Sequence, residues 1–169
     1  EEESTKKVLS FVKTKNTDFY YHKENGNFWN VMVFIDNSVT HEIVKDKEIA
    51  YEGGKLLGEF LNETVDFDSN QLIDVIPNFH DMSFRYKQYA SSLQSASKER
   101  LKKVEKYTKI VALLKDEIHI LQNLKEAGKI PVRVTHNDTK ISNSLFTKEN
   151  KGICMIDTDT VMPGIIHYD

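Results

Sequence analysis

The residues with the clearest capacity for chemistry lie between positions 136 and 157. Asp138 is followed five residues later by Asn143, and a second aspartate, Asp157, comes after two short apolar runs. Carboxylate and amide oxygens are hard donors of the kind that Mg²⁺ prefers, and a positioned carboxylate can accept the proton of a hydroxyl group. Transfer of a phosphoryl group from a nucleotide to a hydroxyl needs both functions. The residue types and their order therefore favour that chemistry.

Within this chemistry the residues divide into two pairs. We expect Asp138 to orient the acceptor hydroxyl and accept its proton, and Lys140 to balance charge on the moving phosphoryl group. We expect the side-chain oxygen of Asn143 to bind one metal ion, and the carboxylate of Asp157 to bridge to the metal ions. The expected cofactors are ATP and Mg²⁺.

The same residues carry a resemblance to a known superfamily. His136-x-Asp138-x-Lys140-x-x-Asn143 has the spacing of the protein-kinase catalytic loop, and Asp157 lies where that superfamily has its metal-binding aspartate. The form His-Asn-Asp, followed by Ile-Asp without Phe-Gly, resembles the aminoglycoside phosphotransferase and choline kinase branch.

Two segments narrow the resemblance further. Residues 135–143 and 156–164 are most similar to the N-acetylhexosamine 1-kinases, which phosphorylate the anomeric hydroxyl of a free amino sugar. The resemblance implies a sugar or amino-alcohol substrate, and choline, homoserine or aminoglycoside acceptors remain alternatives. It also implies that the strand at 31–35 leads into an inter-lobe hinge whose backbone meets adenine. Phe34, Ile35 and Asp36 are therefore the nucleotide-contact candidates.

Four residues near the motif keep alternative interpretations. His136 either braces the loop or acts as an acid or base, and Lys140 is either catalytic or a surface charge. Asp159 is a substrate-binding candidate that could instead cap a turn. Asp169 is as compatible with a structural role as with a functional one.

The first forty residues have the pattern of strands. Residues 8–15 are strand-like, and 28–35 are apolar enough to predict a strand buried on both faces. Between them, Asn25-Gly26 predicts a hairpin turn because both residues tolerate positive φ. Asp36-Asn37-Ser38 ends the second strand.

Helical periodicity follows. A helix is predicted from about 45 to 62, with Ile49, Leu56, Leu57 and Phe60 on one face, and its three glycines predict close backbone packing. A second helix is predicted at about 84–94, capped by Asp81 or Ser83, and a third, core-facing helix at about 97–127. Gly128 and Pro131 end the third helix.

Short strands at 132–135, 145–147 and 153–156 complete the pattern, with a hairpin at 148–152. The predicted class is α+β, a protein-kinase-like fold fragment with a partial N-lobe sheet and a mainly helical C-lobe. Residues 1–40 are assigned to the sheet and hinge. Residues 41–169 are assigned to the C-lobe, with the catalytic loop at 135–143 and the metal-binding segment at 153–164.

Composition limits the partners. The chain has a formal net charge of −3, which argues against a nucleic-acid partner, and no apolar run reaches the length of about 20 residues that crosses a membrane. The acidic N-terminus, residues 1–4, lacks the features of a signal peptide, so we expect a cytoplasmic protein. The single cysteine, Cys154, lies in an apolar run that predicts a buried, inert thiol.

A kinase-like small lobe also needs a phosphate-covering loop and a strand lysine paired with a helix glutamate. Neither can be placed in the roughly thirty residues before the strand at 31–35. We therefore expect a central slice of the catalytic core, poorly active by itself. The alternative is a non-catalytic remnant whose long helix and unfilled surfaces mediate self-association. A truncated small lobe should also expose apolar sheet around Phe11, Phe28 and Val31, so we expect a homo-oligomer, either a dimer or a larger assembly.

Overall fold

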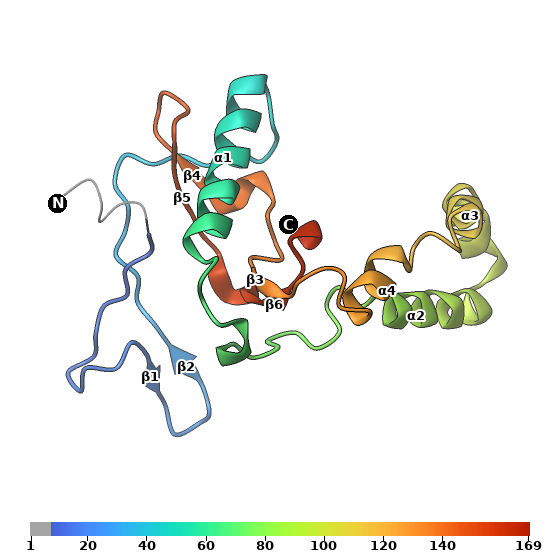
Figure 1. Ribbon diagram of the computed structural model, residues 1–169, viewed down its shortest axis with the longest axis horizontal. Helices are drawn as coiled ribbons and strands as arrows, with labels where there is room; N and C mark the ends of the chain where they lie inside the picture. The colour runs from blue at the N-terminus through green and yellow to red at the C-terminus, as the bar shows by residue number, and fades with distance from the viewer. Residues whose placement is uncertain (1–7) are drawn as a thin grey trace. The chain divides into compact units, whose positions relative to one another are not determined.

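The computed structural model describes residues 8–169, and these form four α-helices and three two-stranded antiparallel sheets. The chain divides into two compact units, whose elements can be followed in Figure 1. One unit runs to Asp66 and takes up the segment Asp138–Asp159; the other contains Phe67–Asn137 and Thr160–Asp169. The mixture of elements confirms the predicted α+β class. The acidic residues 1–4 lie outside the described residues.

The first unit begins with a hairpin of β1 (Tyr21–His22) and β2 (Phe28–Trp29). Its turn contains Gly26 at a φ of +88°, which confirms the turn predicted at Asn25-Gly26. The ribbon extends beyond the named strands, since Val12 N donates to Val31 O at 2.8 Å and Val33 N donates to Ser10 O at 2.8 Å.

The expectation of a strand buried on both faces is wrong. Phe28 is 66% exposed, Val31 63% and Phe34 81%. An apolar strand is buried on both faces only where a packed layer covers each of them. Within residues 8–169 the ribbon has two strands, and these three side chains are left facing solvent.

Helix α1 (Lys47–Glu63) follows, close to the predicted bounds. Its N-cap is Asp46, whose Oδ1 accepts from the backbone N–H groups of Glu48 and Ile49 at 2.9 and 3.0 Å. Ile49 and Leu56 are 2% and 5% exposed, so the predicted apolar face does form a core.

That core lies against a second hairpin, made of β4 (Ser144–Phe146) and β5 (Gly152–Met155). Figure 1 shows α1 lying alongside this hairpin. Phe146 has no exposed surface and Cys154 is 2% exposed, which confirms the buried thiol. Val39 is paired with Phe146 through two backbone hydrogen bonds, so the segment that follows β2 is joined to this hairpin.

The second unit holds α2 (Met82–Ser95), α3 (Lys98–Leu113) and α4 (Ile120–Glu126). Asp81 caps α2 by accepting from Phe84 N at 2.8 Å, as predicted. Its sheet pairs β3 (Arg133–Thr135) with β6 (Met162–Gly164), a strand that the sequence pattern did not predict. Short 3₁₀ turns occur at Ser69–Gln71 and Ile166–Tyr168 here, at Ile141–Asn143 in the first unit, and at Thr158–Thr160.

The single long helix predicted at 97–127 is wrong, because a turn between Leu114 and His119 separates α3 from α4. Helix α3 contains no buried residue, and Tyr107 of its apolar stripe is 63% exposed. Most of a helix's stability in a protein comes from packing of its apolar face. An uncovered stripe supplies little of that energy, so it does not hold one helix continuous through the turn.

Within residues 8–169, no helix is both long and apolar enough to span a membrane.

Candidate active site

The loop between β3 and β4 is closed by a buried amide. Asn143 is 4% exposed, and its Nδ2 donates to the backbone oxygen of Asp138 at 2.9 Å and to Asp138 Oδ2 at 3.1 Å. The loop ends in the 3₁₀ turn Ile141–Asn143, in which Asn143 N donates to Lys140 O at 2.9 Å. The asparagine therefore fixes the direction of the Asp138 carboxylate.

A lysine lies between two carboxylates. The Nζ of Lys140 is 2.8 Å from Asp138 Oδ2 and 3.9 Å from Asp157 Oδ2. The hydrogen bond to Asp138, together with the charges of Asp138 and Asp157, raises the pKa of Lys140. Lys140 is therefore a cation at neutral pH, within reach of both acids.

Asp157 is held at the end of β5 in an uncommon backbone conformation. Its φ is +61°, in the left-handed region that residues other than glycine rarely adopt. The residue before it, Ile156, donates its backbone N–H to Asn143 O at 2.8 Å. This hydrogen bond joins the two segments that carry Asn143 and Asp157. Strained conformations of this kind concentrate at functional sites, because surrounding contacts must maintain them.

The donor chemistry of this cluster suits Mg²⁺. With Asn143 Nδ2 turned toward Asp138, the amide oxygen faces away from that residue, and the Asp157 side chain is 45% exposed. Mg²⁺ is commonly held by one or two protein oxygens, with water and substrate phosphates completing the shell. Among residues 8–169, no group of three or more His, Cys, Asp or Glu residues is arranged to hold a metal ion. With one carboxylate and one amide oxygen as donors, the cluster fits a metal ion that arrives with a phosphate ligand.

In the second unit, the end of β3 is clamped by a carboxylate. Asp169 accepts from the backbone N–H of His136 at 2.9 Å through Oδ2, and from that of Asn137 at 2.6 Å through Oδ1. Asn137 has a φ of +65°, a conformation that asparagine tolerates better than most residues. Asp169 thus has a structural contact, one of the interpretations that the sequence left open.

The same segment is braced by side chains that the sequence pattern did not single out. Asn137 Nδ2 donates to Thr135 O at 3.1 Å and to Thr160 O at 3.0 Å, and Thr160 Oγ1 donates to His136 O at 2.7 Å. His136 has no exposed surface, as a bracing role requires. Isolated threonines and asparagines carry no periodic signal, so these contacts could not be predicted without the pairing of β3 with β6.

The remaining predicted site residues lie outside these hydrogen bonds. Phe34 is exposed, and Ile35 precedes a turn in which Ser38 Oγ donates to Ile35 O at 2.7 Å. Asp36 lies in that turn, next to Asn37 at a φ of +58°. Asp159 is exposed on the 3₁₀ turn that follows Asp157.

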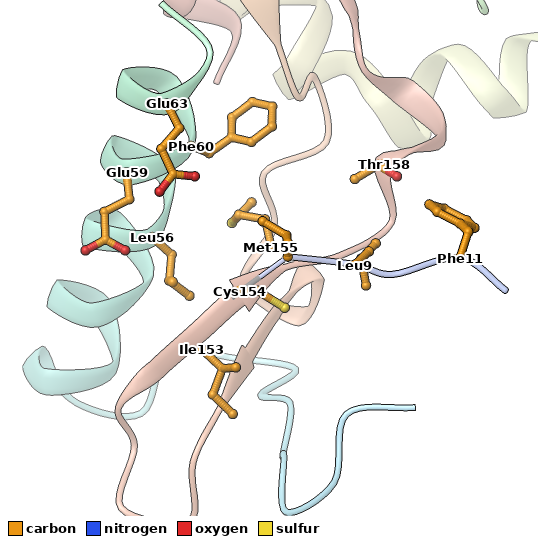
Figure 2. A pocket seen from close by; sticks show the side chains of 11 residues that line it. Leu9, Phe11, Leu56, Glu59, Phe60, Glu63, Ile153, Cys154, Met155 and Thr158 are labelled. Atoms are coloured by element: carbon orange, nitrogen blue, oxygen red, sulfur yellow. The ribbon is translucent and has the colours of Figure 1, made fainter. Parts of the chain in front are cut away.

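A cavity of about 230 Å³ lies between α1, β5 and the start of the described chain. Figure 2 shows Leu56 and Phe60 on α1 and Cys154 and Met155 on β5, with Leu9 and Phe11 on the N-terminal segment. Burial raises the pKa of the Cys154 thiol to about 11, so the reactive thiolate is scarce at neutral pH. The Cys154 thiol is therefore a poor nucleophile, and elements of the first unit form the cavity wall.

Comparison with known proteins agrees with the motif. Residues 19–169 match the family described as the phosphotransferase enzyme family, abbreviated APH.

Proposed function

Because the chain belongs to the phosphotransferase enzyme family, we propose that it is the catalytic core of an ATP- and Mg²⁺-dependent sugar kinase. The family makes the chain a kinase that transfers a phosphoryl group to a hydroxyl of a small molecule. The observation that carries the finer proposal is the cluster of Asp138, Lys140, Asn143 and Asp157. We assign its surroundings to a partial N-lobe sheet and a mainly helical C-lobe.

The contacts support the proposed roles. Asn143 orients the Asp138 carboxylate, which supports a role for Asp138 as acceptor of the proton of the acceptor hydroxyl. Lys140 pairs with Asp138 while no phosphate is near, and moves its ammonium group onto the transferred phosphoryl group. Bound Mg²⁺ would neutralise phosphate charge, held by the Asn143 amide oxygen and the Asp157 carboxylate.

The residues proposed to contact the nucleotide and the acceptor come from the family resemblance of the sequence. We propose that Phe34, Ile35 and Asp36 contact the nucleotide. Val39, which follows them, pairs with Phe146 of the β4–β5 hairpin, the hairpin next to the candidate site residues. Residues 135–143 and 156–164 resemble the N-acetylhexosamine 1-kinases. The proposed acceptor is therefore the anomeric hydroxyl of an N-acetylhexosamine, with Asp159 as its contact.

The test is phosphoryl transfer from ATP to a panel of acceptors, followed by phosphorus NMR of the product. N-acetylhexosamines should give an anomeric phosphate, whereas choline, homoserine and aminoglycosides should give little product. Asp138→Asn should lower kcat by roughly 10²–10⁴-fold, because a positioned base acts in the transition state. Turnover of Asp138→Asn at the wild-type rate would remove the proposed base, and preference for another acceptor would replace the sugar.

The exposed ribbon favours a second candidate function, self-association. Phe28, Trp29 and Val31 are each more than 60% exposed, and they lie on a two-stranded ribbon. Exposed apolar strands pair readily with another chain. We propose that a second copy of the chain covers this ribbon, in which case the isolated chain is a weak kinase and an oligomer.

Light scattering decides this second candidate. The wild-type chain should have the mass of a dimer or larger assembly, and a Val31→Lys variant should shift toward the monomer, since a charge on a strand face opposes pairing. A monomeric wild type that binds Mg·ATP tightly would contradict both the association and the weak activity.

A further inference from the structure

One face of α1 makes three contacts, two with the β4–β5 hairpin and one with the 3₁₀ turn that precedes it. The first is Glu52, a carboxylate that is 6% exposed. Its Oε2 accepts from Gly152 N at 3.0 Å, and its Oε1 lies 3.4 Å from Lys151 Nζ. The backbone hydrogen bond from Gly152 and the neighbouring Lys151 ammonium lower the pKa of Glu52. The start of β5, the strand that leads to Asp157, is therefore fixed to the helix by a charged group.

The second contact is with the 3₁₀ turn that carries Asn143. A β-carbon built on Gly53 would lie 2.6 Å from Cδ1 of Ile141, closer than real β-carbons approach other atoms. Ile141 is the first residue of the turn Ile141–Asn143. The absence of a side chain at position 53 therefore lets the Ile141 side chain of this turn pack directly against the helix backbone.

The third contact also pairs a glycine with a large side chain, but the glycine is on the strand and the side chain is on the helix. A β-carbon on Gly152 would lie 2.7 Å from Cγ of Leu56, so here the strand supplies the glycine and the helix the side chain. Figure 2 shows Leu56 directed from α1 toward β5. The other two glycines of the helix differ, because a β-carbon on Gly54 or Gly58 would meet nothing within 4 Å.

We propose that this face of α1 sets the position of Asn143 relative to Asp157, with Gly53 as a positioning residue. The inference rests on the metal-binding roles proposed above. Gly53 locates Asn143 through Ile141, two residues away, and Glu52 locates the strand that leads to Asp157. The hydrogen bond from Ile156 N to Asn143 O closes the connection between the two segments. Residues that orient metal ligands typically change metal affinity by about 10–100-fold when they are altered.

The test compares Gly53→Ala with Gly54→Ala. Both substitutions add the same methyl group and the same gain in helix propensity, but only the first meets Ile141. Gly53→Ala should raise the Mg²⁺ concentration for half-maximal activity by about tenfold, and should weaken Mn²⁺ binding in the presence of ADP, read by electron paramagnetic resonance. Gly54→Ala should behave as wild type in both measurements.

A double substitution identifies the contact. Ile141→Val removes Cδ1, the atom that the new methyl group meets, so Gly53→Ala with Ile141→Val should recover most of the metal affinity. If Gly53→Ala alone does not fold, Ile141→Val alone decides the matter. The shortened side chain loosens the turn and should raise the Mg²⁺ requirement by about twofold or more, and an unchanged requirement overturns the proposal.

The outcomes separate this inference from the proposed function. A folded Gly53→Ala variant with wild-type Mg²⁺ dependence and wild-type Mn²⁺ affinity overturns the positioning role and leaves the kinase intact. A wild-type protein that binds no Mn²⁺ with ADP removes the metal roles of Asn143 and Asp157. That result overturns the proposed function and the inference together.

Discussion

The part of the chain that the structure describes contains two hairpins with very different surroundings. In the β4–β5 hairpin, Phe146 has no exposed surface and Cys154 is 2% exposed. In the β1–β2 hairpin, Phe28 and Trp29 are 66% and 62% exposed. Both sequences are apolar and both turns are correctly marked by the sequence. The difference in burial comes from α1, which covers the β4–β5 hairpin and provides the contacts that hold it.

The comparison shows that apolar sequence and buried position are separate properties. A strand's residues decide whether it can pair, whereas its burial is decided by another element that packs on it. The candidate metal ligands Asn143 and Asp157 lie immediately before and after the hairpin that α1 covers. The predictions below test whether coverage by α1 is the reason for the difference.

The largest expected effect is on stability. Phe146→Ala should lower the free energy of unfolding by about 3–5 kcal/mol, because it leaves a cavity in a packed core. Phe28→Ala, the matched change in the other hairpin, should cost less than about 1 kcal/mol, since the side chain is already mostly in solvent. Urea denaturation of both variants checks this. Equal losses would show that the exposed ribbon is covered in solution.

The second effect is on the metal requirement. Asp157→Ala should raise the Mg²⁺ concentration for half-maximal activity by about 10–100-fold, and Asn143→Ala by less, because a carboxylate contributes charge as well as an oxygen. Glu24→Ala, in the exposed turn between β1 and β2, should leave the Mg²⁺ curve unchanged. The measurement is a Mg²⁺ titration at saturating ATP. Superimposed curves for Asp157→Ala and wild type would exclude Asp157 as a ligand.

The smallest effect is a pH dependence of stability that comes from Glu52. Its pKa is lowered in the folded protein, so its stabilising contribution is complete above the unfolded value, about 4.3, and is lost as the pH falls through the lower folded value. Glu52→Gln should therefore be less stable than wild type at pH 7, and the gap should close as the pH falls below about 4. Urea midpoints from pH 7 to pH 3 measure the gap.

Glu48→Gln is the control for that series. Glu48 pairs with the same lysine, Lys151, at 2.8 Å, but both side chains are more than half exposed. Exposed ion pairs contribute about 0–1 kcal/mol, so this variant should stay close to wild type throughout. A gap of equal size for the two variants would assign the effect to Lys151 and not to the bond with Gly152.

Local signals predicted much of the fold. Asp81, one of two predicted caps, begins α2. The start of α1 lies close to its predicted position, although its N-cap, Asp46, was not predicted. Gly26 occupies the predicted turn at positive φ, and Gly128, at a φ of +66°, follows the end of α4. Caps and turns are encoded by one or two residues and their own backbone, which is why a single sequence reveals them.

The errors came from contacts between distant segments. Both α1 and α3 carry apolar residues at helical spacing, yet α1 buries Ile49 and Leu56 whereas α3 buries no residue. The three glycines of α1 were expected to mark close packing together, but only Gly53 meets another segment. Strand β6 was missed because Met162–Gly164 is short, contains Pro163, and pairs with a strand about thirty residues earlier.

The candidate site also has a part that the sequence predicted and a part that it did not. The motif spacing predicted the residues of the cluster, and the structure brings Asp138, Lys140, Asn143 and Asp157 together. It did not predict what holds them, such as the buried Glu52 or the hydrogen bond from Ile156 N to Asn143 O. Supporting contacts of this kind depend on which backbone groups the fold leaves to be paired.

The left-handed backbone conformation at Asp157 creates a trade-off between catalytic activity and thermal stability. On its proposed role, the chemistry requires a carboxylate at a φ of +61°, where the backbone favours glycine or asparagine. Selection for thermal stability or expression yield alone would tend to replace this acid, and would do so before it altered the packed residues around it. A laboratory lineage evolved without a catalytic screen should therefore lose turnover at this position while its melting temperature rises.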